Sequence, residues 1–181
     1  MSIQLSKTST KNLNILVDGS PLKMKVPKSV MPFGFSVTDY GYGPNKNLVI
    51  SITDDEFLSS MRELECNVIS EISKMSHDIF NREVDEDEIF NMFNSNMSDD
   101  RLRIKHTKDT VLFDKDGKVM HANIFDGDFS KWSVTCNFLI TGVYFMNKKI
   151  GLILKAHHVK LFEPEKDNSR YMFIDSSSDS D

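Results

Sequence analysis

The pattern of apolar and polar residues predicts a mainly β chain with one helical segment. The most strongly β-prone stretch spans residues 141–162, where two apolar runs flank the polar residues 147–149, as in a β-hairpin. Shorter apolar or alternating runs predict further strands at residues 22–26, 48–52 and 101–105. Closely spaced strands of this kind favour a small antiparallel barrel, closed or nearly closed, over a doubly wound sheet.

A helical segment interrupts the strands. Apolar residues recur at spacings of three and four across residues 57–79, which predicts an amphipathic helix of about 7 turns. Thr53 and Glu56 have the spacing of a capping box at its start. The acidic run at 85–88 suits the first turn of a second, shorter helix, whose buried face would include Phe90.

These patterns divide the chain into three parts. We expect a flexible or edge segment at residues 1–14, one β domain at residues 15–163 with the helical insertion at 54–97, and an acidic tail at residues 164–181. The tail is polar enough to be a disordered terminus. It could equally act as an acidic segment that mimics nucleic acid or docks partner proteins.

Composition narrows the class of protein. No stretch of the sequence is apolar enough for a transmembrane helix, and the start has no compact apolar stretch with a cleavage site, so we expect neither membrane association nor secretion. Cys66 and Cys136 lie far apart and lack the spacing of metal ligands. This fits a reducing compartment and argues against a structural zinc.

The net charge of −5 is the sum of unlike segments. Residues 54–100 carry a net charge of −11, whereas residues 101–160 carry +6. Such asymmetry favours a polyanion-facing portion accompanied by acidic segments that compete for it. The alternative is a solvated acidic helix beside a mildly basic sheet.

Motifs that would indicate catalysis are absent from the sequence. It contains no GxSxG, P-loop, GxGxxG or HExxH, so we expect no enzymatic activity, no cofactor and no metal site. His157 and His158 would point to opposite faces of a regular strand and could not chelate one metal together. The parity of the apolar residues changes near them, which predicts a β-bulge. The DKDG sequence at 114–117 lacks the other ligands of a calcium loop and predicts a hairpin turn.

The basic residues of the β region are interleaved with aromatic residues, a combination typical of proteins that bind single-stranded nucleic acid. On this pattern we expect cationic side chains to contact phosphates and aromatic rings to stack on bases. The expected phosphate contacts are Arg103, Lys105, Lys118, Lys148, Lys149, Lys155 and Lys160. The expected stacking residues are Trp132 and Tyr144, with Tyr40 and Tyr42 on a Gly-rich loop.

The order of the motifs resembles that of a known family. PFGFS at 32–36, LVISI at 48–52 and DDEFLSSMREL at 54–64 are followed by LRIKHTK at 102–108, FDKDGK at 113–118 and the hairpin at 141–162. This order resembles the single-stranded DNA-binding proteins of large nucleocytoplasmic DNA viruses, which are similar to acidic-tailed single-stranded DNA-binding proteins of phages. The resemblance spans roughly residues 21–163.

The resemblance implies an OB-fold core, no catalysis, and sequence-independent coating of single-stranded DNA in replication, recombination and repair. It also implies an intracellular site of action, in the virus factory of the host cytoplasm or in the nucleus. Replication proteins could meet the C-terminal tail, and the chain could form homo-oligomers. The alternative is a virion structural or assembly protein that acts through protein–protein contacts, with the acidic helix as an interface.

Overall fold

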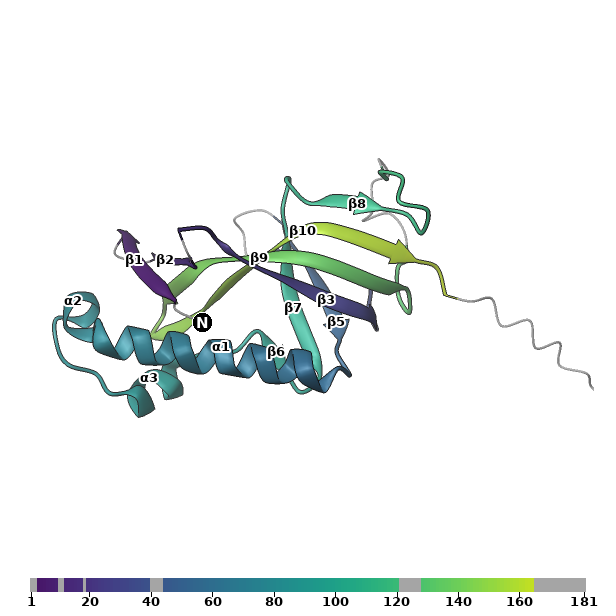
Figure 1. Ribbon diagram of the computed structural model, residues 1–181. Helices are drawn as coiled ribbons and strands as arrows, with labels where there is room; N and C mark the ends of the chain where they lie inside the picture. The colour runs from purple at the N-terminus through teal and green to yellow at the C-terminus, as the bar shows by residue number, and fades with distance from the viewer. Residues whose placement is uncertain (1–2, 10–11, 18, 40–43, 121–127, 165–181) are drawn as a thin grey trace, which may run out of the picture.

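The protein is a mainly β structure with a helical insertion, as predicted (Figure 1). The computed structural model describes residues 3–9, 12–17, 19–39, 44–120 and 128–164. Its strands are β1 (Gln4–Ser9), β2 (Asn12–Leu16), β3 (Leu22–Val30), β4 (Phe35–Asp39), β5 (Pro44–Ser51), β6 (Met97–Ser98), β7 (Arg101–His106), β8 (Val111–Phe113), β9 (Ser133–Met146) and β10 (Lys149–Phe162). Its helices are α1 (Asp55–Lys74), α2 (Ser76–Phe80) and α3 (Glu86–Met92).

Five strands pair in a cycle. The antiparallel hairpin of β9 and β10 continues through β3, β5 and β7, and β7 then pairs with β10. The β7–β10 pairing is parallel and the other four are antiparallel. Two links are short: β3 meets β5 through Val30 and Ser51, and β10 meets β7 through Lys155 and Lys105.

The β9–β10 hairpin spans the molecule (Figure 1). Met146 pairs with Lys149, so the turn has two residues, Asn147 and Lys148, and both have positive φ. A type I′ turn requires this geometry because its twist matches that of the strands. The first hairpin arm is longer than predicted, because Ser133–Met146 form one continuous strand. Gly142 lets β2 cross it closely, since a Cβ there would lie 2.3 Å from the Leu13 carbonyl oxygen.

The described part of residues 1–14 forms an edge hairpin of the sheet, which is one of the two expectations for this segment. Residues 4–9 and 12–16 form an antiparallel hairpin, and β2 pairs with β9 from Asn12 to Asn14. Ile3, Leu13 and Ile15 are buried. The physical reason is that these few apolar side chains alternate with polar ones, which is enough to bury one face of a short hairpin against the sheet.

Helix α1 lies along the strands and closes one side of the core (Figure 1). The expected cap at Thr53 is wrong: Asp54 is the N-cap, and its Oδ1 accepts a hydrogen bond from the Phe57 N–H at 2.7 Å. The predicted apolar stripe is buried, and Phe57 packs edge-on against Phe138 of β9. Within the described residues, no helix is long and apolar enough to cross a membrane.

The helix is shorter than the expected span to residue 79, because it ends at Lys74 and the five-residue α2 follows. Both backbone groups of Val84 are bonded to serines there: Ser73 Oγ donates to its carbonyl, and its N–H donates to Ser76 Oγ. These bonds fold the chain back into α3. Asp85 caps α3, as the acidic run predicted, but Phe90 is 65% exposed, because only Ile89 of this two-turn helix is buried.

The two cysteines lie in contrasting environments, which generates a labelling prediction. Cys136 is buried in β9, and burial raises the pKa of its thiol to about 12, whereas Cys66 of α1 is exposed. We expect a thiol reagent at pH 8 to modify Cys66 in the native protein, and both cysteines only after denaturation, because the thiolate is the reactive species. Mass spectrometry would identify the modified residue. Rapid labelling of the folded Cys66→Ser variant would contradict this placement of Cys136.

Candidate nucleic-acid interface

Strand β7 presents a row of cations on its outer face. Its side chains alternate, so Leu102 and Ile104 are buried while Arg101, Arg103 and Lys105 are exposed. Next to it, β5 places Ser51 beside Arg101, Val49 beside Arg103 and Asn47 beside Lys105. The neighbouring side chains on β5 are therefore small or uncharged. Arg101 Nε lies 4.0 Å from Asp100 Oδ1 at the start of the strand, whereas Arg103 and Lys105 form no ion pair among the described residues.

A pocket of about 580 Å³ opens on this face, and we call it the β5–β7 pocket. It is formed by the turn before β4, the strands β4, β5, β7 and β9, and the segment that follows α3. Its lining contains two arginines, two aromatic residues and no carboxylate. The lining residues are Phe33, Ser36, Val49, Asn94, Ser95, Asn96, Ser98, Arg101, Arg103 and Tyr144.

Phe33 forms one side of the pocket. Its side chain is 60% exposed, and the Arg101 guanidinium lies 5.1 Å from the centre of its ring. The ring is presented by a turn at Gly34, which has a φ of 66°. A Cβ on Gly34 would lie 2.9 Å from the Phe129 carbonyl carbon, so only glycine fits there. An exposed ring beside a guanidinium is suited to stacking and to phosphate contact at once.

Tyr144 of β9 forms the other aromatic part of the lining. Its hydroxyl oxygen accepts a hydrogen bond from Asn94 Nδ2 at 3.1 Å. Gly151 of β10, its cross-strand partner, leaves room for the ring: a Cβ there would lie 2.6–2.7 Å from the Tyr144 Oη, Cε1 and Cζ atoms. Asn94 and Gly151 therefore define the orientation of this ring.

The segment after α3 forms a polar wall of the pocket. Asn94 N–H donates to the Ile150 carbonyl, and the Asn96 carbonyl accepts from Arg103 N–H, so the wall is tied to β10 and β7. Asn96 Oδ1 is buried and accepts no hydrogen bond from the residues that the structure describes. Ser95 donates to Glu65 of α1, a carboxyl whose pKa is raised by its burial. The wall is thus held in place by hydrogen bonds to β7, β10 and α1.

The structure brings only some of the predicted site residues together. Arg103 and Tyr144 line the pocket, and Lys105 continues the row on β7, with Lys155 beside it on β10. Lys148 and Lys149 lie at the β9–β10 turn.

Five other predicted positions lie elsewhere or outside the described residues. Lys160 lines a separate hollow, and the Lys118 N–H donates to Asp114 Oδ1 in the predicted turn at 114–117. Trp132 is partly buried against Phe129, with ring centres 4.9 Å apart, and lines none of the pockets described. Tyr40 and Tyr42 lie outside the described residues, as does the tail beyond Pro164.

Sequence reasoning missed much of the lining. Arg101 shares the parity of Arg103 on the same strand, so alternation could have identified it. Phe33 stands in a Pro-Phe-Gly turn, which is a signal for an exposed aromatic residue. The polar wall at 94–98 follows a helix with no periodicity and carries no signal of its own.

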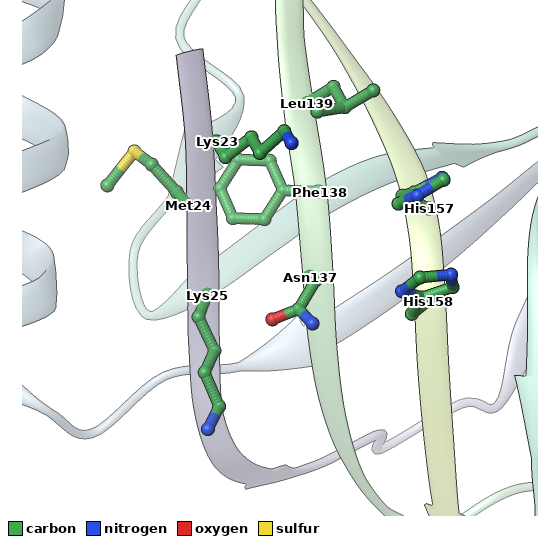
Figure 2. Close-up of a pocket in the computed structure, with 8 residues that line it drawn as sticks. All are labelled: Lys23, Met24, Lys25, Asn137, Phe138, Leu139, His157 and His158. Carbon is green, nitrogen blue, oxygen red and sulfur yellow. The ribbon is translucent and has the colours of Figure 1, made fainter.

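His157 and His158 combine one confirmed expectation with one correction. The predicted bulge is present, as a register shift between Ala156 and His158. The expectation that the two rings point to opposite faces is wrong: their centres are 4.0 Å apart (Figure 2). The extra residue of the bulge breaks the alternation and turns both rings to one side. No group of three or more His, Cys, Asp or Glu side chains among the described residues could hold a metal ion.

Comparison with known proteins shows that this chain shares its fold with solved structures. No family model matches the chain, and no curated protein matches its sequence. The single-stranded DNA-binding protein from bacteriophage Enc34, in complex with single-stranded DNA, matches with a TM-score of 0.52 at 9% identity, over 91% of this chain and 97% of that one. The single-stranded DNA-binding protein gp2.5 encoded by bacteriophage T7 matches with a TM-score of 0.51 at 13% identity, over 82% and 96%. At these identities the shared property is the fold.

The packing of Tyr144 on Gly151 can be tested by a double-mutant cycle. Gly151→Ala places a methyl group within the Tyr144 ring, so we expect it to destabilise the protein by about 1–3 kcal/mol. In the Tyr144→Ala background the clash is absent, and the same change is expected to cost less, with a coupling energy of about 0.5–3 kcal/mol. Urea unfolding of the four proteins measures the cycle. An equal cost in both backgrounds would show that the ring lies elsewhere.

Proposed function

We propose that this chain binds single-stranded DNA without sequence preference, using the β5–β7 pocket. The observation that carries the proposal is the joint presence of Arg101 and Arg103 with the rings of Phe33 and Tyr144 in one pocket that contains no carboxylate. Cationic side chains that follow a backbone, combined with aromatic rings that stack on bases, are the two components of single-strand recognition.

We further propose that the five-strand cycle is an OB-fold barrel. In chain order its strands are β3, β5, β7, β9 and β10. Numbered 1 to 5 in that order, neighbouring strands around the cycle are 1-2-3-5-4-1, which means that β3 pairs with β5, β5 with β7, β7 with β10, β10 with β9, and β9 with β3. OB-folds bind oligonucleotides on their second and third strands and on the loops between strands one and two and strands four and five. Here those strands are β5 and β7, and those loops carry Phe33 and Lys148.

Binding would use two kinds of contact, ionic contacts to phosphates and stacking on bases. Arg101, Arg103 and Lys105 would neutralise successive phosphates, which makes the affinity dependent on salt. Phe33 and Tyr144 would each stack on a base for roughly 1–3 kcal/mol, and stacking accepts every base because all have a π-face. The described contacts include no set of donors and acceptors that would read one base edge, which fits binding without sequence preference.

The biological setting belongs to the same proposal. The bacteriophage Enc34 structure of shared fold contains single-stranded DNA, which supports the ligand class. We propose that the protein coats single strands during replication, recombination and repair of a large DNA virus, in the host cytoplasm or nucleus, and catalyses no reaction. Contacts between replication proteins and the tail at residues 164–181, and homo-oligomers, are part of this proposal, as are base contacts by Tyr40, Tyr42 and Trp132.

The function is tested by titrating fluorescent oligo-dT at several salt concentrations. We expect binding at low salt that weakens as salt rises, because phosphate neutralisation releases counterions. Absence of binding at low salt, or binding that is insensitive to salt, would overturn the proposal and favour a virion structural role.

The role of Arg103 is tested by the Arg103→Gln variant. Losing one phosphate contact is expected to lower the affinity for oligo-dT and to reduce the slope of log affinity against log salt by about 0.7. Fluorescence anisotropy across a salt series measures both. Arg62→Gln, which removes an exposed arginine from α1, is the matched control and should leave the slope unchanged. Equal effects of the two variants would indicate that only net charge matters.

The β9–β10 turn allows stability and binding to be separated. Lys148 has a φ of 61°, a left-handed conformation that costs a non-glycine residue about 1–2 kcal/mol. Lys148→Gly is expected to stabilise the fold by up to about 1 kcal/mol, because glycine also loses more chain entropy on folding. It should weaken oligo-dT binding at the same time.

Asn147→Gly is the control for this variant. It changes the other turn residue, whose φ is 51°, without removing a charge, so binding should be retained. Urea unfolding and anisotropy give the two readouts. If Lys148→Gly leaves the affinity of the parent intact, Lys148 does not contact the strand.

A further inference from the structure

A second cationic surface lies on the outer face of β3, β9 and β10. Strand β9 runs between the other two and contributes Leu139 and Asn137. Lys23 and Lys25 of β3 pair with these two residues on one side, and Lys155 and His158 of β10 pair with them on the other. An uncharged floor is thus bordered by Lys23 and Lys25 on the β3 side and by Lys155 and the two histidines on the β10 side. Figure 2 shows Lys23, Lys25, His157 and His158 around it.

Two hollows join along this face, and together we call them the outer groove. One has a volume of about 400 Å³ and the other about 280 Å³, and they share Lys25, Asn137 and His158. The second extends the groove to Lys160 of β10 and to Phe113 of β8. No carboxylate lines either hollow, and no lysine of the groove forms an ion pair within the residues that the structure describes.

The groove offers rings as well as charge. The His157 and His158 rings lie 4.0 Å apart on its surface because of the bulge, and Phe113 meets His158 edge-on at 5.6 Å. Along β3, Lys23 and Lys25 are two residues apart and so repeat at about 6.6 Å, comparable to the distance between successive phosphates of an extended strand. An extended polyanion carrying flat groups matches both features.

The outer groove is connected to the β5–β7 pocket. Lys155 lies opposite Lys105, the residue that continues the arginine row of β7, in the register of the β7–β10 pair. Lysines opposite each other on adjacent strands, whose backbones are spaced about 4.8 Å apart, carry like charges that repel each other. A polyanion lying across both would relieve this repulsion. The lysine pair therefore forms a cationic link from the pocket to the groove.

We propose that the outer groove is a second nucleic-acid contact surface, which takes the phosphates of the same single strand after it leaves the β5–β7 pocket. The inference rests on the proposed function for its first contact. A strand would pass from Arg103 over the Lys105–Lys155 link to Lys25 and then toward Lys160. Long oligonucleotides would therefore use both surfaces, and short ones only the pocket.

The test compares oligonucleotide lengths with a Lys23→Gln, Lys25→Gln double variant. Oligo-dT of about 6 nucleotides fits one OB-type surface, and oligo-dT of about 20 nucleotides can reach beyond it. We expect the variant to bind the short oligonucleotide within twofold of the parent. For the long one we expect about tenfold weaker binding and a salt slope smaller by about 1.4. The number of nucleotides covered per protein on poly-dT should also fall.

The control variant removes two positive charges from another part of the protein. Arg62→Gln, Lys74→Gln removes the same charge from α1 and should change neither length class. Thermal melting verifies that each variant folds, and Lys25→Glu alone provides a second variant with the same expected selectivity for long strands. Equal weakening for both lengths, or none, overturns the inference.

Two further outcomes separate the inference from its premises. Tighter binding of both lengths by the double variant would overturn it and would indicate that these lysines contact an anionic protein segment, such as residues 163–181 of this chain. A parent protein that binds the short oligonucleotide, with a variant indistinguishable on both lengths, overturns the groove and leaves the proposed function standing. A parent that binds neither length overturns the proposed function, and the inference falls with it.

Discussion

The pairing of β9 with β10 is the interaction on which the rest of the structure depends. Each of these two strands has fourteen residues. Of the remaining strands in the five-strand cycle, β3 pairs with β9, β7 pairs with β10, and β5 pairs with both β3 and β7. The register is set at a two-residue turn in which Asn147 and Lys148 both have positive φ. That conformation has a cost for lysine, and the long ladder of cross-strand pairs offsets it. Because β9 also pairs with β2 and β3, and β10 with β7 and β8, this hairpin joins both proposed binding surfaces.

The core and the candidate interface are two sides of the same strands. On β7, alternation buries Leu102 and Ile104 and, by the same geometry, exposes Arg101 and Arg103. A slip of one residue would bury the arginines, so the energy that fixes the register of the core also fixes the position of the charges. The bulge at His157 is the local exception, because it turns two adjacent rings to one face and so adds them to the cationic groove.

Charge is separated in the fold as it is in the sequence. The acidic residues of the insertion lie on helices, where Asp54 and Asp85 cap the helix starts and Glu88 pairs with Arg82. Of the cations on β3, β7 and β10, Arg101 lies 4.0 Å from the Asp100 carboxylate, and the others form no ion pair among the described residues. Lysines that face one another, such as Lys105 and Lys155, destabilise the free protein slightly. This arrangement becomes favourable when a polyanion is bound, which is why both surfaces are best explained by one extended ligand.

The sequence by itself determined the mainly β class, the amphipathic helix, the turn at 114–117, the β9–β10 hairpin, the bulge at the histidines and the outward direction of Arg103. All of these follow from local periodicity or from the chemistry of a few adjacent residues. Only the tertiary structure decided that Phe33 meets Arg101, that Tyr144 lies over Gly151 against Asn94, and that Lys105 lies beside Lys155. These contacts join residues far apart in the chain, and they depend on which strands pair and in what register. The period of a single strand shows which side chains point outward, but it carries no information on which other strand will lie beside them.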